Sequence, residues 1–137
     1  MTILADTSGL YALMDRSERA HASVAALVSR TRALIVIPVL TLVEVDYLLH
    51  QRLGGHMAAA FASAVASGEF SLEGLVPGDL ARAVEVMRQY SDARIGLVDA
   101  SVVATAERLG VPRILTLDRR HFSMFRPRHC AAFELLP

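Results

Sequence analysis

The sequence contains no lysine and only one cysteine, and each absence excludes a kind of chemistry. All 14 basic residues are arginine. Without lysine, the chain can form neither a Walker-type phosphate loop nor a Schiff base with a substrate. Arginine remains suited to phosphate, because its planar guanidinium group can bind two oxygens at once. The single Cys130 excludes an internal disulfide bond and a zinc site built from several cysteines.

The sequence also lacks a net charge and a long apolar run. The formal net charge is zero, so the composition gives no overall electrostatic reason to bind nucleic acid. The most apolar run, residues 34–43, contains Pro38 and is too short to span a membrane. The sequence does not open with a basic segment followed by an apolar one, so we expect no signal peptide. We therefore expect a soluble protein of the cytoplasm.

The composition is typical of a folded globular chain. Of the 137 residues, 53% are hydrophobic and 20% are charged, which predicts one domain covering residues 1–137. Short apolar segments alternate with segments of helical periodicity. This alternation predicts an α/β fold, a three-layer α/β/α sandwich with a mainly parallel central sheet, in which the strands near Ile3, Ile35 and Leu115 are adjacent. The expected strands are residues 1–5, 34–37, 70–76, 113–117 and 131–136.

The segment of residues 95–118 reads as a helix, a turn and a strand, and it carries two acids. Apolar residues recur at helical spacing, Gly110 can end the helix, and residues 113–117 form a short apolar strand. Asp99 lies in the first turn of this helix, and Asp118 stands at the end of the strand. Because open α/β sheets place their sites at the carboxyl ends of the strands, the two acids are expected to converge there.

Two further acids also stand at the boundaries of expected elements. Asp6 follows the first strand and can cap the next helix through its carboxylate. Glu44 follows the second strand, and with Thr41 it has the spacing of a capping box. Each acid alone therefore has a structural explanation. Together with Asp99 and Asp118, however, they occupy the positions where an α/β fold brings its loops together.

Clustered carboxylates repel one another, and one of them would normally take up a proton. A divalent cation removes that conflict, and hard cations such as Mg²⁺ and Mn²⁺ prefer carboxylate and water oxygens. Such a cation can bind a phosphodiester oxygen and generate hydroxide at neutral pH. The chemistry that the four acids predict needs no histidine or cysteine nucleophile.

Two other polar residues have structural explanations of their own. Asp92 can cap the helix that follows, organise Arg94, or join the acidic site from its edge. His21 lies near the start of an amphipathic helix, and we expect it to be a packed or hydrogen-bonded structural histidine.

The acids belong to four motifs that resemble a known family in their order. The motifs are Ile-Leu-Ala-Asp-Thr-Ser at 3–8, Thr-Leu-Val-Glu at 41–44, Tyr-Ser-Asp at 90–92 leading to Leu-Val-Asp-Ala-Ser at 97–101, and Leu-Thr-Leu-Asp at 115–118. At these residues the sequence resembles the PIN-domain ribonucleases of the VapC toxin type. The resemblance covers essentially the whole chain.

The resemblance implies an endoribonuclease that depends on Mg²⁺ or Mn²⁺ and cuts tRNA, rRNA or mRNA. It also implies a cognate antitoxin that blocks the enzyme, and a homodimer. Asp6 and Asp99 would be the principal metal ligands, and Glu44 and Asp118 would complete the acidic pocket directly or through water. Accessory contacts to the site would come from Thr7, Ser8, Asp92 and Thr116.

Four arginines that follow Asp118 are expected near the mouth of the pocket, where they would bind the RNA backbone. They are Arg119, Arg120, Arg126 and Arg128. The alternative is an ordinary solvated basic surface.

Two other functions compete with the nuclease. One is an inactive member of the fold that only binds an antitoxin-like partner, and the four intact acids argue against it. The other is a different phosphate-handling α/β enzyme. A haloacid-dehalogenase-like phosphatase would need a second aspartate where Ser8 stands, and a receiver domain would need a lysine after its late strand. Neither residue is present.

Overall fold

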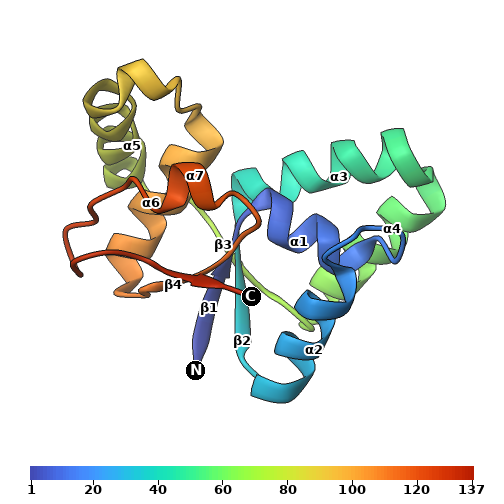
Figure 1. The fold of residues 1–137 in the computed structure, drawn as a ribbon. Coiled ribbons are helices and arrows are strands. Elements are labelled where there is room, and N and C mark those ends of the chain that lie inside the picture. The colour runs from blue at the N-terminus through green and yellow to red at the C-terminus, as the bar shows by residue number, and fades with distance from the viewer.

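The structure is a computed structural model that describes all 137 residues. Its centre is a five-stranded, fully parallel sheet in the order β3-β2-β1-β4-β5 (Figure 1). The strands are β1 (Thr2–Ala5), β2 (Leu34–Pro38), β3 (Ser71–Glu73), β4 (Arg113–Leu115) and β5 (Glu134–Leu136). Leu4 of β1 pairs with Val36 on one side and with Ile114 on the other, which confirms the predicted adjacency of these three strands.

Helices cover both faces of the sheet, so the predicted three-layer α/β/α sandwich is confirmed (Figure 1). Helices α1 to α4 pack on one face, and helices α5 to α7 pack on the other. The helices are α1 (Thr7–Met14), α2 (His21–Thr31), α3 (Val39–Leu53), α4 (Gly55–Ala66), α5 (Pro77–Gln89), α6 (Leu97–Leu109) and α7 (Arg119–Phe122), with a 3₁₀ turn at Ser91–Ala93. None of these helices combines the length and the apolar character that a membrane crossing requires.

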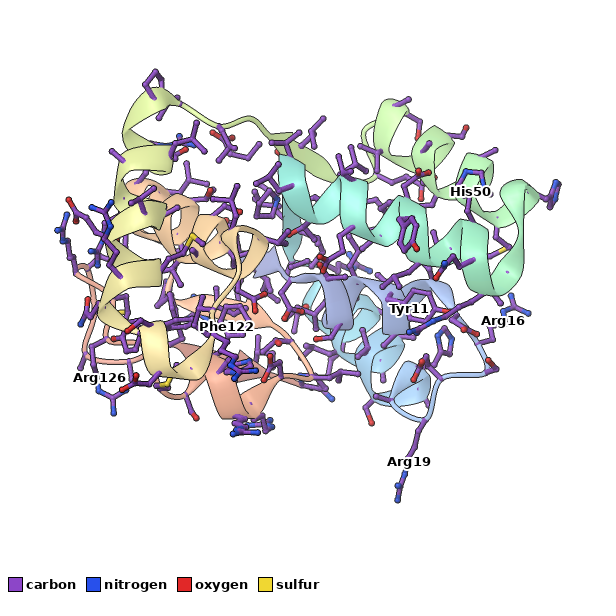
Figure 2. The ribbon with its side chains drawn as sticks, turned by 90° about the horizontal axis from the view of Figure 1, so that it is seen from above. Tyr11, Arg16, Arg19, His50, Phe122 and Arg126 are labelled. Atoms are coloured by element: carbon purple, nitrogen blue, oxygen red, sulfur yellow. The ribbon has the colours of Figure 1, made fainter.

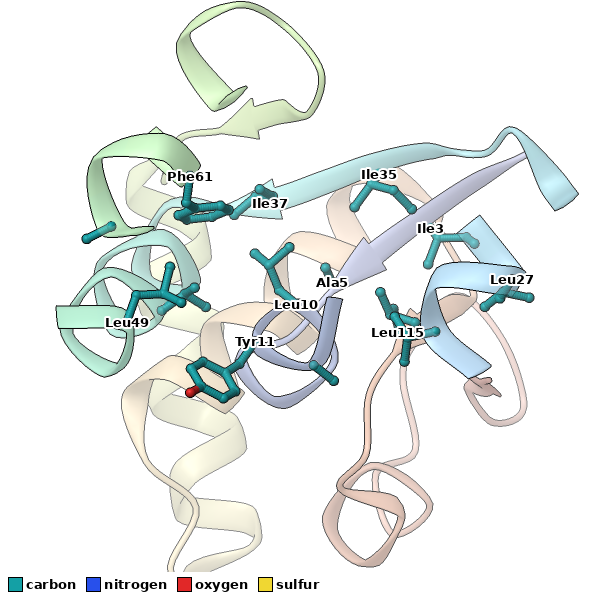
Figure 3. Packing of buried hydrophobic residues seen from close by; sticks show 14 residues of the cluster. Ile3, Ala5, Leu10, Tyr11, Leu27, Ile35, Ile37, Leu49, Phe61 and Leu115 are labelled. Carbon is teal, nitrogen blue, oxygen red and sulfur yellow. The ribbon is translucent and has the colours of Figure 1, made fainter. Parts of the chain in front are cut away.

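Alternate side chains of the central strands enter two separate cores. Ile3 and Ala5 point to the face covered by α1 to α4 and belong to the same buried core as Leu10 and Phe61 (Figure 3). Leu4 points to the opposite face and joins the core of α5, α6 and α7. Because both faces are covered, the strands are apolar without alternation, as is typical of parallel sheets.

Several elements differ from the sequence prediction. β4 ends at Leu115 rather than at residue 117, and β5 begins at Glu134 rather than at residue 131. The third strand is shorter than residues 70–76, because the chain leaves the sheet at Gly74 before α5 begins at Pro77. Helix α3 begins at Val39 directly after β2, with Pro38 at its N-cap. The predicted capping box is therefore wrong, since Thr41 already lies inside the helix.

Helix α1 approaches the end of β4 unusually closely, and this approach positions the site. The backbone N–H of Asp6 donates to the carbonyl oxygen of Leu115 at 3.1 Å. Gly9, one turn further on, leaves no room for a side chain, because a Cβ atom there would lie 2.3 Å from the same carbonyl oxygen. Glycine at this position therefore allows the first turn of α1 to rest on the end of β4.

Candidate active site

A pocket of about 310 Å³ opens at the carboxyl ends of β1 and β4, between α1, α3 and α6. All four predicted acids, Asp6, Glu44, Asp99 and Asp118, line it. The seven other lining residues are Thr7, Ser8, Tyr11, Glu18, Leu48, Arg52 and Leu117. We call this cavity the acidic pocket. Its acids come from four separate elements, which the parallel sheet and its short connections bring together.

Asp6 is the most deeply buried of the four acids, with 3% of its surface exposed. It caps α1, since Oδ1 accepts hydrogen bonds from the Gly9 N–H and from Ser8 Oγ, each at 2.9 Å. Thr116 Oγ1 donates to Oδ2 at 2.5 Å. Burial raises the pKa of Asp6 to about 6; the three hydrogen bonds oppose this shift, and the charge of Asp99 adds to it. Asp6 therefore serves as a helix cap and as a wall of the acidic pocket.

The hydroxyls of Ser8 and Thr116 connect the two strand ends beneath the acids. Ser8 Oγ accepts a hydrogen bond from the N–H of Leu117 at 2.9 Å, and Thr116 Oγ1 accepts one from the N–H of Asp118 at the same distance. Both hydroxyls also donate to Asp6. The two hydroxyls therefore help to fix the positions of Asp6 and Asp118.

Asp99 lies in the first turn of α6 and receives no hydrogen bond that would hold its charge. Burial, together with the charges of Asp118 and Glu44, raises its pKa to about 6, against the opposing effect of His121. The N-cap of α6 is Gly96, so Asp99 does not cap the helix. Glu44 likewise caps nothing in α3. The structural explanation therefore fails for both residues.

His121 holds the Asp118 carboxylate in place through two contacts, and the sequence alone did not single it out. Its backbone N–H donates to Asp118 Oδ1 at 3.0 Å, and its ring Nδ1 lies 2.8 Å from Oδ2. Ligand atoms from Asp99, Asp118 and His121 all lie within 4.8 Å of one another. The three-residue spacing of Asp118 and His121 in an expected helical turn was the signal that could have revealed this pair.

The remaining predicted site residues do not line the acidic pocket. Asp92 is exposed in the 3₁₀ turn and does not cap α6, whose N-cap is Gly96. His21 is structural as expected, because its Nδ1 lies 2.8 Å from the carbonyl oxygen of Ala12.

The four arginines after Asp118 lie outside the acidic pocket. Arg119 donates to the carbonyl oxygen of Pro137, Arg126 to that of Ser123 at 2.8 Å, and Arg128 to Glu85 at 2.8 Å. Figure 2 shows Arg126 on the opposite side of the molecule from Tyr11. Arg120 is exposed. Their role in RNA binding stays a prediction.

The donor set of the acidic pocket fits a hard divalent cation. It offers four carboxylates, and the raised pKa of Asp6 and Asp99 reflects the cost of keeping charge at this buried point without a counter-charge. The hydroxyl of Thr7, also in the lining, is buried without a hydrogen-bond partner. Mg²⁺ and Mn²⁺ prefer hard oxygen ligands, above all carboxylates and water.

Comparison with known proteins agrees with the fold. The model of the PIN domain matches residues 3–125, so the chain belongs to the PIN-domain family, as its motifs predicted. It is 34% identical over 135 residues to Ribonuclease VapC26 of Mycobacterium tuberculosis H37Rv, covering 98% of this chain and 100% of that protein.

A solved structure has the same fold. The crystal structure of Mycobacterium tuberculosis VapC20, described as a Sarcin-Ricin loop cleaving toxin, superposes with a TM-score of 0.79. The match covers 85% of this chain and 90% of the other, at 23% sequence identity.

Proposed function

We propose that this protein is a metal-dependent endoribonuclease and the toxin of a VapC-type toxin–antitoxin pair. The observation that carries the proposal is the convergence of Asp6, Glu44, Asp99 and Asp118 on one pocket. Membership of the PIN-domain family and the extended identity to Ribonuclease VapC26 support the same conclusion. The reaction is hydrolysis of an RNA phosphodiester, with tRNA, rRNA or mRNA as the substrate.

Asp6 and Asp99 would be the principal ligands of the cation, and Glu44 and Asp118 would complete the site. A bound Mg²⁺ or Mn²⁺ supplies a Lewis acid for the phosphate oxygen and lowers the pKa of a bound water. The chain's own residues hold this arrangement in place. Ser8 and Thr116 orient Asp6, and His121 orients Asp118 through both carboxylate oxygens.

The proposal includes a cognate antitoxin, a homodimer and action in the cytoplasm, where the RNA is found. Two large apolar side chains on the outer surface of α3 support a protein partner: Val43 is 61% exposed and Tyr47 is 58% exposed. Exposed apolar patches on folded proteins commonly mark contact surfaces.

A second function is an inactive PIN-like module that only binds an antitoxin-like partner. It would have no need for the pocket's carboxylates. Asp99 in particular raises the energy of the metal-free fold, because it is kept charged near neutral pH beside Asp118 and Glu44. A destabilising acid that caps nothing is easier to explain in an active nuclease.

Incubation with total RNA tests the proposal directly. The wild type is expected to produce discrete cuts with Mg²⁺ or Mn²⁺ and none with EDTA, and mapping the cut ends identifies the target. Asp99→Asn should remove the cuts. Asp46→Asn is the matched control, since Asp46 lies on the same helix as Glu44 but outside the acidic pocket. Metal-independent cutting, or equal cutting by Asp99→Asn, would refute the proposal.

A further inference from the structure

The acidic pocket extends beyond its four acids to a single arginine. Glu44, Leu48 and Arg52 succeed one another at intervals of four residues along α3, and all three line the pocket. This spacing places them on one face of the helix. The eight residues from Glu44 to Arg52 correspond to about 12 Å along the helix axis. Arg52 is the only arginine in the lining.

The guanidinium group of Arg52 is held in place by an aromatic ring. Its Cζ atom lies 4.9 Å from the ring centroid of Tyr11, which is buried between α1 and α3 (Figure 2). The hydroxyl of Tyr11 donates to Asp15 Oδ2 at 2.6 Å, and Ser17 Oγ donates to Asp15 Oδ1 at 2.6 Å. These hydrogen bonds fix the position of the Tyr11 ring. The positive charge of Arg52 over the face of the ring is attracted to it.

The N–H groups of Arg52 are only partly engaged within the chain, which leaves donors for a ligand. The nearest carboxylate oxygen is Glu18 Oε1 at 4.0 Å, and Arg52 also lowers the pKa of Asp15 and opposes the rise in the pKa of Tyr11. The side chain is 53% exposed. By contrast, the donors of two other arginines are used within the chain: Arg82 donates to Glu107, and Arg108 donates to Asp79. Arg52 therefore stacks on Tyr11 at the wall of the acidic pocket and keeps donors available for a ligand.

We propose that Arg52 is a binding site for a phosphate of the RNA strand that flanks the phosphate being cut. This inference rests on the proposed function. A guanidinium fork matches a phosphate with two parallel hydrogen bonds. Because Arg52 stands about two turns of α3 beyond Glu44, it would bind the backbone beside the phosphate that lies at the four acids. It also offsets the repulsion that the acidic pocket exerts on RNA.

Binding of RNA without cutting tests this site. The probe is a fluorescein-labelled single-stranded RNA oligonucleotide of mixed sequence, titrated with Asp99→Asn protein in EDTA over a series of KCl concentrations. Adding Arg52→Gln should weaken binding by about tenfold. It should also reduce the slope of log affinity against log salt by about 0.7, as expected for one lost phosphate contact.

Two further variants make the result specific. Arg52→Lys keeps the charge and loses the planar fork, so the salt slope should remain while the affinity falls several-fold. Arg30→Gln removes the same charge from an exposed position near the start of β2, at the opposite end of the strands from the pocket. It should change neither quantity. Because Arg52 is half exposed, all three variants should melt within a few degrees of the parent.

Cleavage kinetics locate the bound phosphate. With an RNA that the wild type cuts in Mg²⁺, Arg52→Gln should raise KM and leave kcat within about twofold, since a flanking contact binds substrate and transition state equally. A lower kcat with unchanged KM would place Arg52 at the reacting phosphate and overturn the inference.

The inference and the proposed function fail in different ways. If the wild type cuts RNA and Arg52→Gln binds with unchanged affinity and salt slope, Arg52 is not a phosphate site and the nuclease stands. If the wild type neither binds nor cuts any RNA, both are wrong.

Discussion

Asp6 and Asp99 line the same pocket but are held in opposite ways. Asp6 accepts hydrogen bonds from the Gly9 N–H and from the hydroxyls of Ser8 and Thr116. Asp99 receives none and faces the charges of Asp118 and Glu44. Asp6 therefore supports the fold through its hydrogen bonds as well as lining the site, whereas Asp99 weakens the metal-free fold.

Replacing each of these residues by asparagine should separate the two roles. Asp99→Asn should abolish cleavage and leave the metal-free protein at least as stable, because carboxylate repulsion is relieved. Asp6→Asn should also abolish cleavage but should cost about 1 kcal/mol: its Oδ1 can still cap α1, but an NH₂ group replaces the oxygen that accepts from Thr116. Thermal melting with and without Mg²⁺ measures both effects, since the wild type gains stability by binding the ion and the variants gain much less. Wild-type cleavage by an Asp99→Asn protein that melts lower would remove Asp99 from the site.

The raised pKa values predict how the stability of the metal-free protein depends on pH. Asp6 and Asp99 have a pKa of about 6 when folded and an ordinary value of 3.8. The folded state therefore binds their protons more tightly than the unfolded state, and stability should rise as pH falls from about 7 to 5. Hydrogen bonds from Ser17 and Tyr11 lower the pKa of Asp15, so its stabilisation is lost only at more acidic pH. Urea unfolding in EDTA should show this rise, and Asp99→Asn should reduce it; an equal rise in both proteins would contradict the assignment.

His121 is expected to position Asp118. His121→Leu removes the ring N–H that faces Asp118 Oδ2, and it should weaken Mg²⁺ binding by about 10- to 100-fold, the usual cost of losing a residue that orients a ligand. His121→Asn restores a donor near the place of Nδ1 and should recover part of the affinity. The measurement is the shift of the melting temperature with Mg²⁺ concentration. If His121→Leu responds to Mg²⁺ as the wild type does, His121 has no such role.

At the scale of elements, the site depends on the contact between α1 and β4, and Gly9 is its tightest point. Gly9→Ala would place Cβ 2.3 Å from the carbonyl oxygen of Leu115, which is backbone and cannot move aside cheaply. We expect a loss of about 1–3 kcal/mol in urea unfolding, with a further loss of cleavage per folded molecule because Asp6 shifts. Gly78→Ala in α5 meets no atom within 4 Å and should be neutral or slightly stabilising. Equal stability of the two variants would show that α1 adapts without strain.

The elements that the sequence predicted correctly are those whose ends are set by residues close to them in the sequence. Helix α6 ends at Gly110 in a left-handed conformation with φ of 67°, as its periodicity and glycine indicated. The convergence of the four acids followed from the rule for parallel sheets. The capping box at Thr41 failed, because the position of Pro38 decided where α3 begins.

The part of the acidic pocket that escaped prediction depends on packing between distant segments. Tyr11 and Arg52 meet only because α1 packs against α3, and no motif in either helix indicates the contact. His121 reaches Asp118 only because residues 119–122 form a short helical turn. Arg126 and Arg128, which follow Asp118 in the sequence, donate to the carbonyl oxygen of Ser123 and to Glu85. Whether they bind RNA stays a prediction.

At the scale of the whole molecule, we expect a homodimer. The apolar side chains that α3 exposes, together with Leu72 at 47% exposure on β3, would be covered in part by a second copy. Light scattering at micromolar concentration should give twice the 14.9 kDa mass of the chain. A mass of one chain across that range would contradict the expectation.

The strand order determines when the acidic pocket can form during synthesis on the ribosome. β1 is made first and lies at the centre of the sheet, but its neighbour β4 begins only at Arg113. A nascent chain that has reached Asp99 still lacks the strand against which Asp6 is fixed, as well as Asp118 itself. Pairing between strands so far apart in the sequence also tends to slow folding, because a long loop must close first. We therefore expect the acidic pocket to be among the last features to assemble, so that an unfinished chain would lack the proposed nuclease activity.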